Sequence, residues 1–154
     1  MYKKIMVPLD GSELAECVLP HAEAFIKAFK IPDVVFVRVV EPETLPYRVE
    51  GAVDPLIVAE REAGRKSSAK DYLDRIAKRF KDGRTAVHSE VLIGRVTESL
   101  ADYAEQSDVD LFIIATHGRS GVTRWVMGSV ADKLLRSASL PVLMVRAPGA
   151  KGGM

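Results

Sequence analysis

The sequence has one cysteine, Cys17, which excludes internal disulfides and zinc or redox sites of the CxxC type. It also lacks an excess of charge: 22 Lys and Arg residues face 21 Asp and Glu residues, a formal net charge of +1. A protein that binds nucleic acid through a broad basic surface is therefore not expected. No apolar run approaches the ~20 residues that span a bilayer, so no membrane partner is expected.

Motifs for common catalytic sites are missing as well. The chain has no Walker A sequence and no GxGxxG after a strand, so P-loop hydrolysis and ordinary dinucleotide binding lose support. The three histidines lie far apart, and no serine has the spacing of a nucleophile elbow. Because neither a catalytic triad nor a metal cage can be assembled, no catalytic residue is assigned.

What is present suits one globular domain. The chain has 154 residues, of which 47% are hydrophobic and 28% charged. We predict a single domain over residues 1–147 and a flexible tail over 148–154. The chain begins with a strand-like segment, so no signal peptide is predicted and the cytoplasm is the expected compartment.

Strand-like and helical patterns alternate along the chain. Strands are predicted at residues 5–9, 34–40, 86–93, 111–115 and 142–145. Helices are predicted from a Ser12 cap to Phe29, from Asp54–Pro55 to about Lys81 with Gly83 as the stop, over residues 96–104, and over residues 129–137.

This alternation predicts an α/β fold, a single doubly wound domain. Its five-stranded parallel sheet has the order 3-2-1-4-5, with helices on both faces. The first and fourth strands are then neighbours, and ligands bind such sheets outside the carboxyl ends of these strands. Asp10-Gly11-Ser12 and Thr116-His117-Gly118 follow the two strands. We therefore predict a binding crevice between these segments.

The segment after the fourth strand is suited to an anion. After Gly118 and nine intervening residues, the pair Gly128-Ser129 opens a predicted helix. Glycine lets backbone N–H groups approach a ligand closely, and a helix N-terminus presents unpaired donors with partial positive charge. The pattern predicts binding of a nucleotide or a similar anion.

In the predicted order, the strand at residues 142–145 lies at an edge. An apolar edge strand promotes aggregation unless something covers it. We predict a homodimer in which this strand pairs with its copy across a two-fold axis. The alternative is that a helix or the tail covers the edge.

Three separated motifs together resemble the universal stress protein family. The stretch Ala115 to Gly121 followed by Gly128-Ser129-Val130 resembles the family signature GxxG, nine residues, then G[ST]. The segments at residues 4–12 and 141–145 fit the start and end of the family pattern. The resemblance covers essentially the whole chain and implies that it binds ATP or another adenine nucleotide.

The family pattern also implies roles for single residues. It assigns Gly118, Gly128, Ser129 and Val130 to the phosphates. It places Asp10 near the ribose, where a carboxylate suits ribose hydroxyls or Mg²⁺ better than phosphate. The alternative for Asp10 is a helix cap or an Asx turn.

Pro8 and Val39 match positions that line the adenine pocket. His117 either touches the ribose or phosphate or packs at the strand end. Arg119 either neutralises phosphate charge or is simply solvated.

One position departs from the signature, because Ala115 stands where the family has its first glycine. Alanine adds one methyl group and disfavours positive φ without forbidding it. We expect nucleotide binding to survive this change.

The resulting hypothesis is a cytoplasmic, dimeric protein that uses an adenine nucleotide as a regulatory ligand in a stress response. One alternative is a nucleotide-free interaction protein of the same fold, its pocket impaired by Ala115. Another is a slow Mg²⁺-dependent ATPase that uses Asp10; hydrolysis would be slow because no general base or arginine finger can be named.

Overall fold

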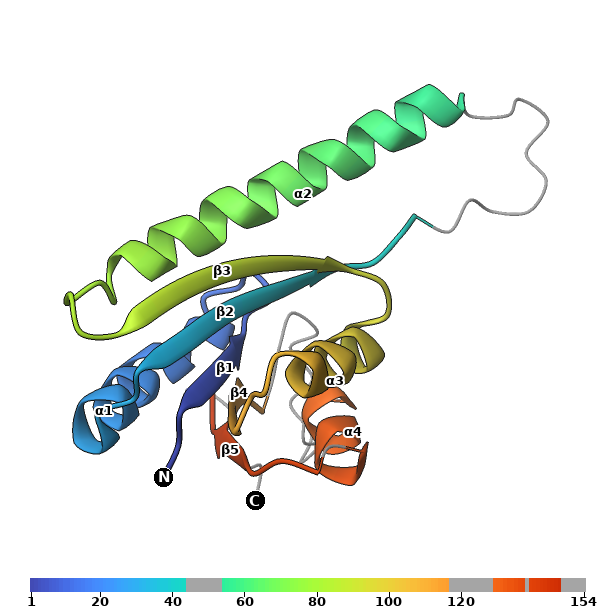
Figure 1. Ribbon diagram of the computed structural model, residues 1–154. Helices are drawn as coiled ribbons and strands as arrows, with labels where there is room; N and C mark the ends of the chain where they lie inside the picture. Colours follow the sequence, from blue (N-terminus) through green and yellow to red (C-terminus); the bar gives the residue numbers. More distant parts are fainter. Residues whose placement is uncertain (44–53, 117–128, 138, 148–154) are drawn as a thin grey trace, which may run out of the picture.

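The computed structural model describes residues 1–43, 54–116, 129–137 and 139–147. Strands and helices alternate along these ranges (Figure 1). The strands are β1 (Lys4–Pro8), β2 (Asp33–Val40), β3 (Ala86–Ile93), β4 (Leu111–Ala115) and β5 (Val142–Val145). The helices are a short 3-10 helix η1 (Ala15–Val18), α1 (Leu19–Phe29), α2 (Pro55–Lys78), α3 (Val96–Gln106) and α4 (Ser129–Ser137).

The strands form one parallel sheet in the order β3-β2-β1-β4-β5. The predicted doubly wound fold and its strand order are therefore confirmed. Ile5 in the central strand β1 lies opposite Val34 of β2 and Leu111 of β4, and all three are buried. Such apolar strands suit a sheet that is covered on both faces.

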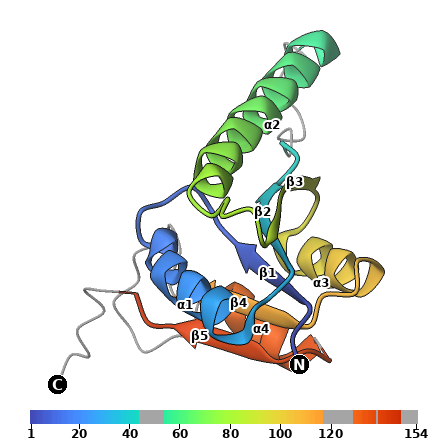
Figure 2. The same ribbon diagram turned by 60° about the vertical axis from the view of Figure 1, so that its left-hand side comes forward.

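The core has two layers, one on each face of the sheet (Figure 2). α1 and α2 pack on one face, and α3 and α4 pack on the other. Side chains of β2 alternate between the layers: Phe36 joins the α1–α2 layer and Val37 joins the α3–α4 layer. The alternation continues, so Arg38 and Val39 also point to opposite faces.

The first helix begins later than predicted. Ser12 does not cap α1; its hydroxyl accepts the N–H of Ala15, 3.2 Å away, at the start of η1. α1 itself begins at Leu19, with Pro20 in its first turn. Proline has no N–H to donate to the carbonyl of Glu16 and its ring crowds that group, which disfavours α-helical hydrogen bonding at this point.

α2 begins as predicted but ends earlier. The Asp54 side chain caps it by accepting the N–H of Leu56, 2.9 Å away. The helix was predicted to reach about Lys81, but it ends at Lys78, where the chain tightens into turns with i→i−3 hydrogen bonds. This turn brings the Phe80 ring to 4.9 Å from the Phe36 ring, measured between centroids.

β3 and β5 are the two edges of the sheet, as predicted. β3 is half-exposed along its length, in keeping with its polar sequence. Among the described helices, none combines the length and the apolar character needed to cross a membrane. The predicted tail at 148–154 lies outside the described residues.

Candidate functional site

β1 and β4 separate at their carboxyl ends. Their pairing stops at Met6 opposite Phe112, whereas β1 remains paired with β2 as far as Pro8. The next residue, Leu9, still donates its N–H to Val37 of β2 at 2.8 Å. Because successive residues of a strand alternate between neighbours, the Pro8 nitrogen faces β4, and it carries no hydrogen to donate. Proline at the end of a central strand thus helps to open the predicted crevice.

The turn after β1 holds Asp10 at the mouth of this crevice. One carboxylate oxygen of Asp10 accepts hydrogen bonds from the N–H of Ser12, at 2.8 Å, and from its hydroxyl. This is an Asx turn, the alternative considered for this residue. Asp10 also lines a cleft at this end of the sheet. Its carboxylate therefore forms the Asx turn and borders the candidate site at the same time.

A cleft of about 960 Å³ lies along the carboxyl ends of the strands. This volume is at the upper end of the range of about 300–1,000 Å³ that is usual for ligand pockets. The side of the cleft that faces α3 and α4 is apolar. It is lined by Pro8, Val39, Val96, Leu100, Ile114 and Val130.

The opposite side of the cleft is polar and belongs largely to α2. Figure 1 shows α2 extending beyond the carboxyl ends of β2 and β3, so its N-terminal half stands beside the cleft. This side is lined by Arg38, Arg61, Gly64, Arg65 and Ser68. Glu41 and Glu43, just after β2, also line the cleft.

The structure brings together five of the residues predicted from sequence. Pro8, Asp10, Val39, Ala115 and Val130 all line this one cleft. They come from β1 and the turn after it, from β2, from β4 and from α4, as a site at the switch point of the sheet requires. Their roles in nucleotide binding stay predictions.

Other predicted residues lie outside the described ranges. These are His117, Gly118, Arg119 and Gly128. Ser129 is the first residue of α4, but its side chain is not among those described.

Ala115 is the last residue of β4, in extended backbone. Among the described non-glycine residues, positive φ occurs only at Lys30 and Asp108. The alanine that replaces the signature glycine is therefore unstrained, and its methyl group is the only addition to the cleft wall.

The arginines of the α2 side were missed by sequence analysis. Arg38 sits within an apolar strand, which was a usable signal. Its guanidinium carbon lies 5.7 Å from the centre of the Tyr72 ring. On the other side it rests against Gly11, where an added Cβ would lie 2.9 Å from Nη1 of Arg38. Gly11 also has φ +86°, a conformation that favours glycine.

The pKa of Tyr72 reflects the charged groups around Arg38. The pKa of Tyr72 is raised to about 12, mainly by burial and also by the Glu16 and Asp10 carboxylates, whereas the Arg38 cation opposes the rise. The Glu16 carboxylate is also 3.9 Å from a guanidinium nitrogen of Arg79. These groups connect the middle of α2 to the turn that carries Asp10.

The described residues do not provide a protein cage for a metal. No group of three or more His, Cys, Asp or Glu side chains within them could hold an ion. Mg²⁺ in nucleotide sites commonly takes one or two carboxylates together with phosphate oxygens. Asp10 fits such a partial role, and the phosphates would have to supply the other ligands.

The sequence matches a known protein family over nearly its whole length. Residues 1–146 match the model of the universal stress protein family. The chain belongs to the universal stress protein family. The predicted resemblance is therefore confirmed over nearly the whole sequence.

Relatives in this family cover the same length. The chain is 30% identical to universal stress protein MJ0577 of Methanocaldococcus jannaschii, over 95% of this chain and 96% of the relative. The solved structure of MJ0577 superposes with a TM-score of 0.81 at 28% identity, over 97% of this chain and 99% of that one.

Two more distant structures share the fold. A universal stress protein in complex with cAMP has a TM-score of 0.68 at 20% identity, and covers 95% of this chain and 98% of its own. A family member from Arabidopsis thaliana with AMP bound has a TM-score of 0.65 at 12% identity, and covers 96% and 93%.

Proposed function

We propose that this universal stress protein binds ATP or another adenine nucleotide in the cleft as a regulatory ligand in a stress response. The observation that carries the proposal is the position of the cleft, at the parted carboxyl ends of β1 and β4. Ligands of doubly wound sheets bind at this switch point.

The two parts of a nucleotide have matching surroundings in the cleft. The apolar side, with Pro8 and Val39, suits the adenine ring. Val130 lies in the first turn of α4, where backbone N–H groups lack partners within the helix and attract phosphate. Asp10, in the turn after β1, also lines the cleft and suits ribose hydroxyls. Two proteins of the same fold hold adenine nucleotides, cAMP and AMP, so the fold accommodates this class of ligand.

The test is a pair of alanine substitutions. Ala115→Leu would place a bulky side chain in the cleft, whereas Ala86→Leu adds the same atoms at an exposed position of β3. Equilibrium dialysis with labelled ATP should show uptake by the wild type, a loss of at least about tenfold in affinity for Ala115→Leu, and no change for Ala86→Leu. Mass spectrometry of small molecules released from the purified protein would identify the nucleotide.

The two alternatives predict different results. If the wild type takes up no nucleotide at millimolar concentration, the nucleotide-free interaction protein is favoured instead. Slow hydrolysis is tested with Mg²⁺ and ATP by comparing the wild type with Asp10→Ala. Equal turnover in both would exclude an ATPase that depends on Asp10.

We also propose that two copies pair through β5. β5 is an edge strand, and Val142, Leu143 and Met144 are only partly buried. Met144 on β5 and Leu92 on β3 are both partly buried and pack against the same core layer, at opposite edges of the sheet. Met144→Glu should therefore give a monomer in sedimentation velocity, whereas Leu92→Glu should stay dimeric. A monomeric wild type would refute the pairing.

The cytoplasmic location stays a prediction from the sequence.

A further inference from the structure

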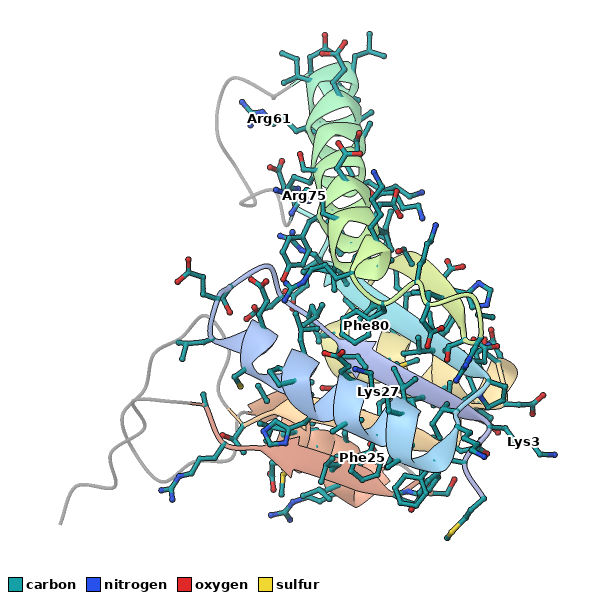
Figure 3. The ribbon with its side chains drawn as sticks, turned by 90° about the vertical axis from the view of Figure 1, so that its left-hand side faces the viewer. Lys3, Phe25, Lys27, Arg61, Arg75 and Phe80 are labelled. Atoms are coloured by element: carbon teal, nitrogen blue, oxygen red, sulfur yellow. The ribbon has the colours of Figure 1, made fainter. Side chains whose placement is uncertain are left out.

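The inward face of α2 changes character midway along the helix. Leu73 and Ala69, one turn apart, are buried against the sheet. Two further steps of four residues along the same face lead to Arg65 and Arg61, which line the cleft instead. Figure 3 shows Arg61 projecting sideways from the N-terminal part of α2. The row of apolar side chains that packs on the sheet is thus followed by a row of arginines where the helix extends beyond the core.

Within the described residues, these two arginines differ from a neighbouring cation of α2 in their ion pairing. Within the described part of the chain, Arg61 and Arg65 form no ion pair, whereas Lys70 on the same helix pairs with Asp74 at 3.0 Å. Two like charges four residues apart on one helix face repel each other. An anion between them would remove this repulsion.

A third cation completes this side of the cleft. The Arg38 guanidinium lies close to the Gly11 backbone and 5.7 Å from the centre of the Tyr72 ring, which places it beside the Asp10 turn. A planar guanidinium with five N–H donors suits the oxygens of a phosphate group.

Carboxylates line the cleft too, and they limit what can bind. Asp10, Glu41 and Glu43 balance the three arginines in formal charge. A ligand must therefore match charges locally, with hydroxyls near the carboxylates and an oxyanion at the guanidinium groups. In the proposed function the 5′-phosphates bind at the α4 end, whereas α2 packs beside β2 and β3, on the other side of β1 in the sheet order.

We infer that Arg61 and Arg65, together with Arg38, form a second anion subsite that receives a phosphate on the ribose of the bound nucleotide. The inference depends on the proposed function, because it requires the ribose beside Asp10. It assigns the ligand to a chemical class: adenosine nucleotides that carry a 2′- or 3′-phosphate in addition to the 5′-phosphate.

The experiment compares ligands that differ by one phosphate. Isothermal titration calorimetry would measure affinities for adenosine 5′-monophosphate, adenosine 2′,5′-bisphosphate and adenosine 3′,5′-bisphosphate. For the wild type, at least one bisphosphate should bind about tenfold more tightly than the monophosphate, as expected for new charge-assisted hydrogen bonds. Raising the salt concentration should reduce this advantage.

Variants then locate the effect. Arg61→Gln/Arg65→Gln should abolish the bisphosphate advantage, so that bisphosphates and monophosphate bind this variant within about twofold of one another. Lys66→Gln/Lys78→Gln removes the same charge from exposed positions of α2 that do not line the cleft, and should keep the advantage. Circular dichroism would show that both variants keep the fold.

Failure of the subsite and failure of the nucleotide site give different results. If the monophosphate binds the wild type but neither bisphosphate binds better, the subsite is refuted and the proposed function stands. The subsite is refuted in the same way if the arginine variant keeps the bisphosphate advantage. If no adenine nucleotide binds at all, both the subsite and the proposed function are refuted.

Discussion

The two halves of α2 belong to one continuous helix but differ in what they contact. The C-terminal half buries Ala69, Leu73, Ile76 and Ala77 against the sheet. The N-terminal half leaves Leu56 71% exposed and turns arginines toward the cleft. A helix of the length of α2 is stable in this context because one half is anchored by packing. The other half is then free to present polar groups without contributing to the core.

The largest effect expected from this comparison is on stability. Leu73→Ala should lower the free energy of unfolding by about 2–5 kcal/mol, because it removes a fully buried side chain and leaves a cavity. Leu56→Ala, the same substitution in the other half of the helix, should change it by less than about 0.5 kcal/mol. Urea denaturation measures the free energy of unfolding of both variants. Similar decreases in the two would contradict the difference in packing between the halves of α2.

The next effect concerns the contact between the Asp10 turn and Arg38. Gly11→Ala should destabilise the protein by about 1–3 kcal/mol, from positive φ and from a Cβ placed against the guanidinium. Gly83→Ala is the control, since Gly83 has φ +78° but no atom within 4 Å of an added Cβ. The excess loss of Gly11→Ala over Gly83→Ala in thermal unfolding isolates the close approach of Arg38. Equal losses would mean that Arg38 simply moves aside.

A smaller and opposite effect is expected at Gly64. This glycine lies within the N-terminal half of α2, and an added Cβ would meet nothing within 4 Å. Gly64→Ala should therefore stabilise the protein by about 0.5–1 kcal/mol through helix propensity. Ala69→Gly, in the packed half, should destabilise it by at least the same amount. A loss of stability in Gly64→Ala would show that the N-terminal half is packed after all.

The last effect is a pH dependence at Tyr72, which has no influence on stability at neutral pH. Its pKa in the folded protein, about 12, lies above the ordinary value of 10.0. The folded state therefore disfavours the phenolate, and the stabilisation is complete below pH 10 and is lost as the pH rises from 10 to 12. Tyr72→Phe should lose stability less steeply than the wild type across this window in chemical denaturation. Parallel curves for the two proteins would contradict the shifted pKa.

The fold could be predicted from the sequence because its signals are local. β3, β4, β5 and α4 have the predicted bounds, since each is an apolar or amphipathic run between clear breaks. The errors arose where a local pattern competes with another constraint. Pro20 lies where η1 gives way to α1, and α2 ends in a tight turn before Gly83, with Phe80 against Phe36.

The site was predictable only in part, for a physical reason. Pro8, Asp10 and Ala115 adjoin strand ends, and topology alone brings such positions together. Arg61 and Arg65 reach the cleft only because α2 extends beyond the sheet. The relation of a long helix to a distant strand end depends on tertiary packing, which no pattern in residues 55–68 encodes. Arg38 within an apolar strand was the one available hint.

Pro8 affects how much free energy the protein spends on reorganisation when a ligand binds. Since its nitrogen cannot donate to β4, the hydrogen bond that another residue could form there does not have to be broken before a ligand enters at the carboxyl ends of the two strands. This missing donor is a permanent property of the covalent chain. Association can then proceed without remodelling the central sheet, and less of the interaction free energy is offset by reorganisation.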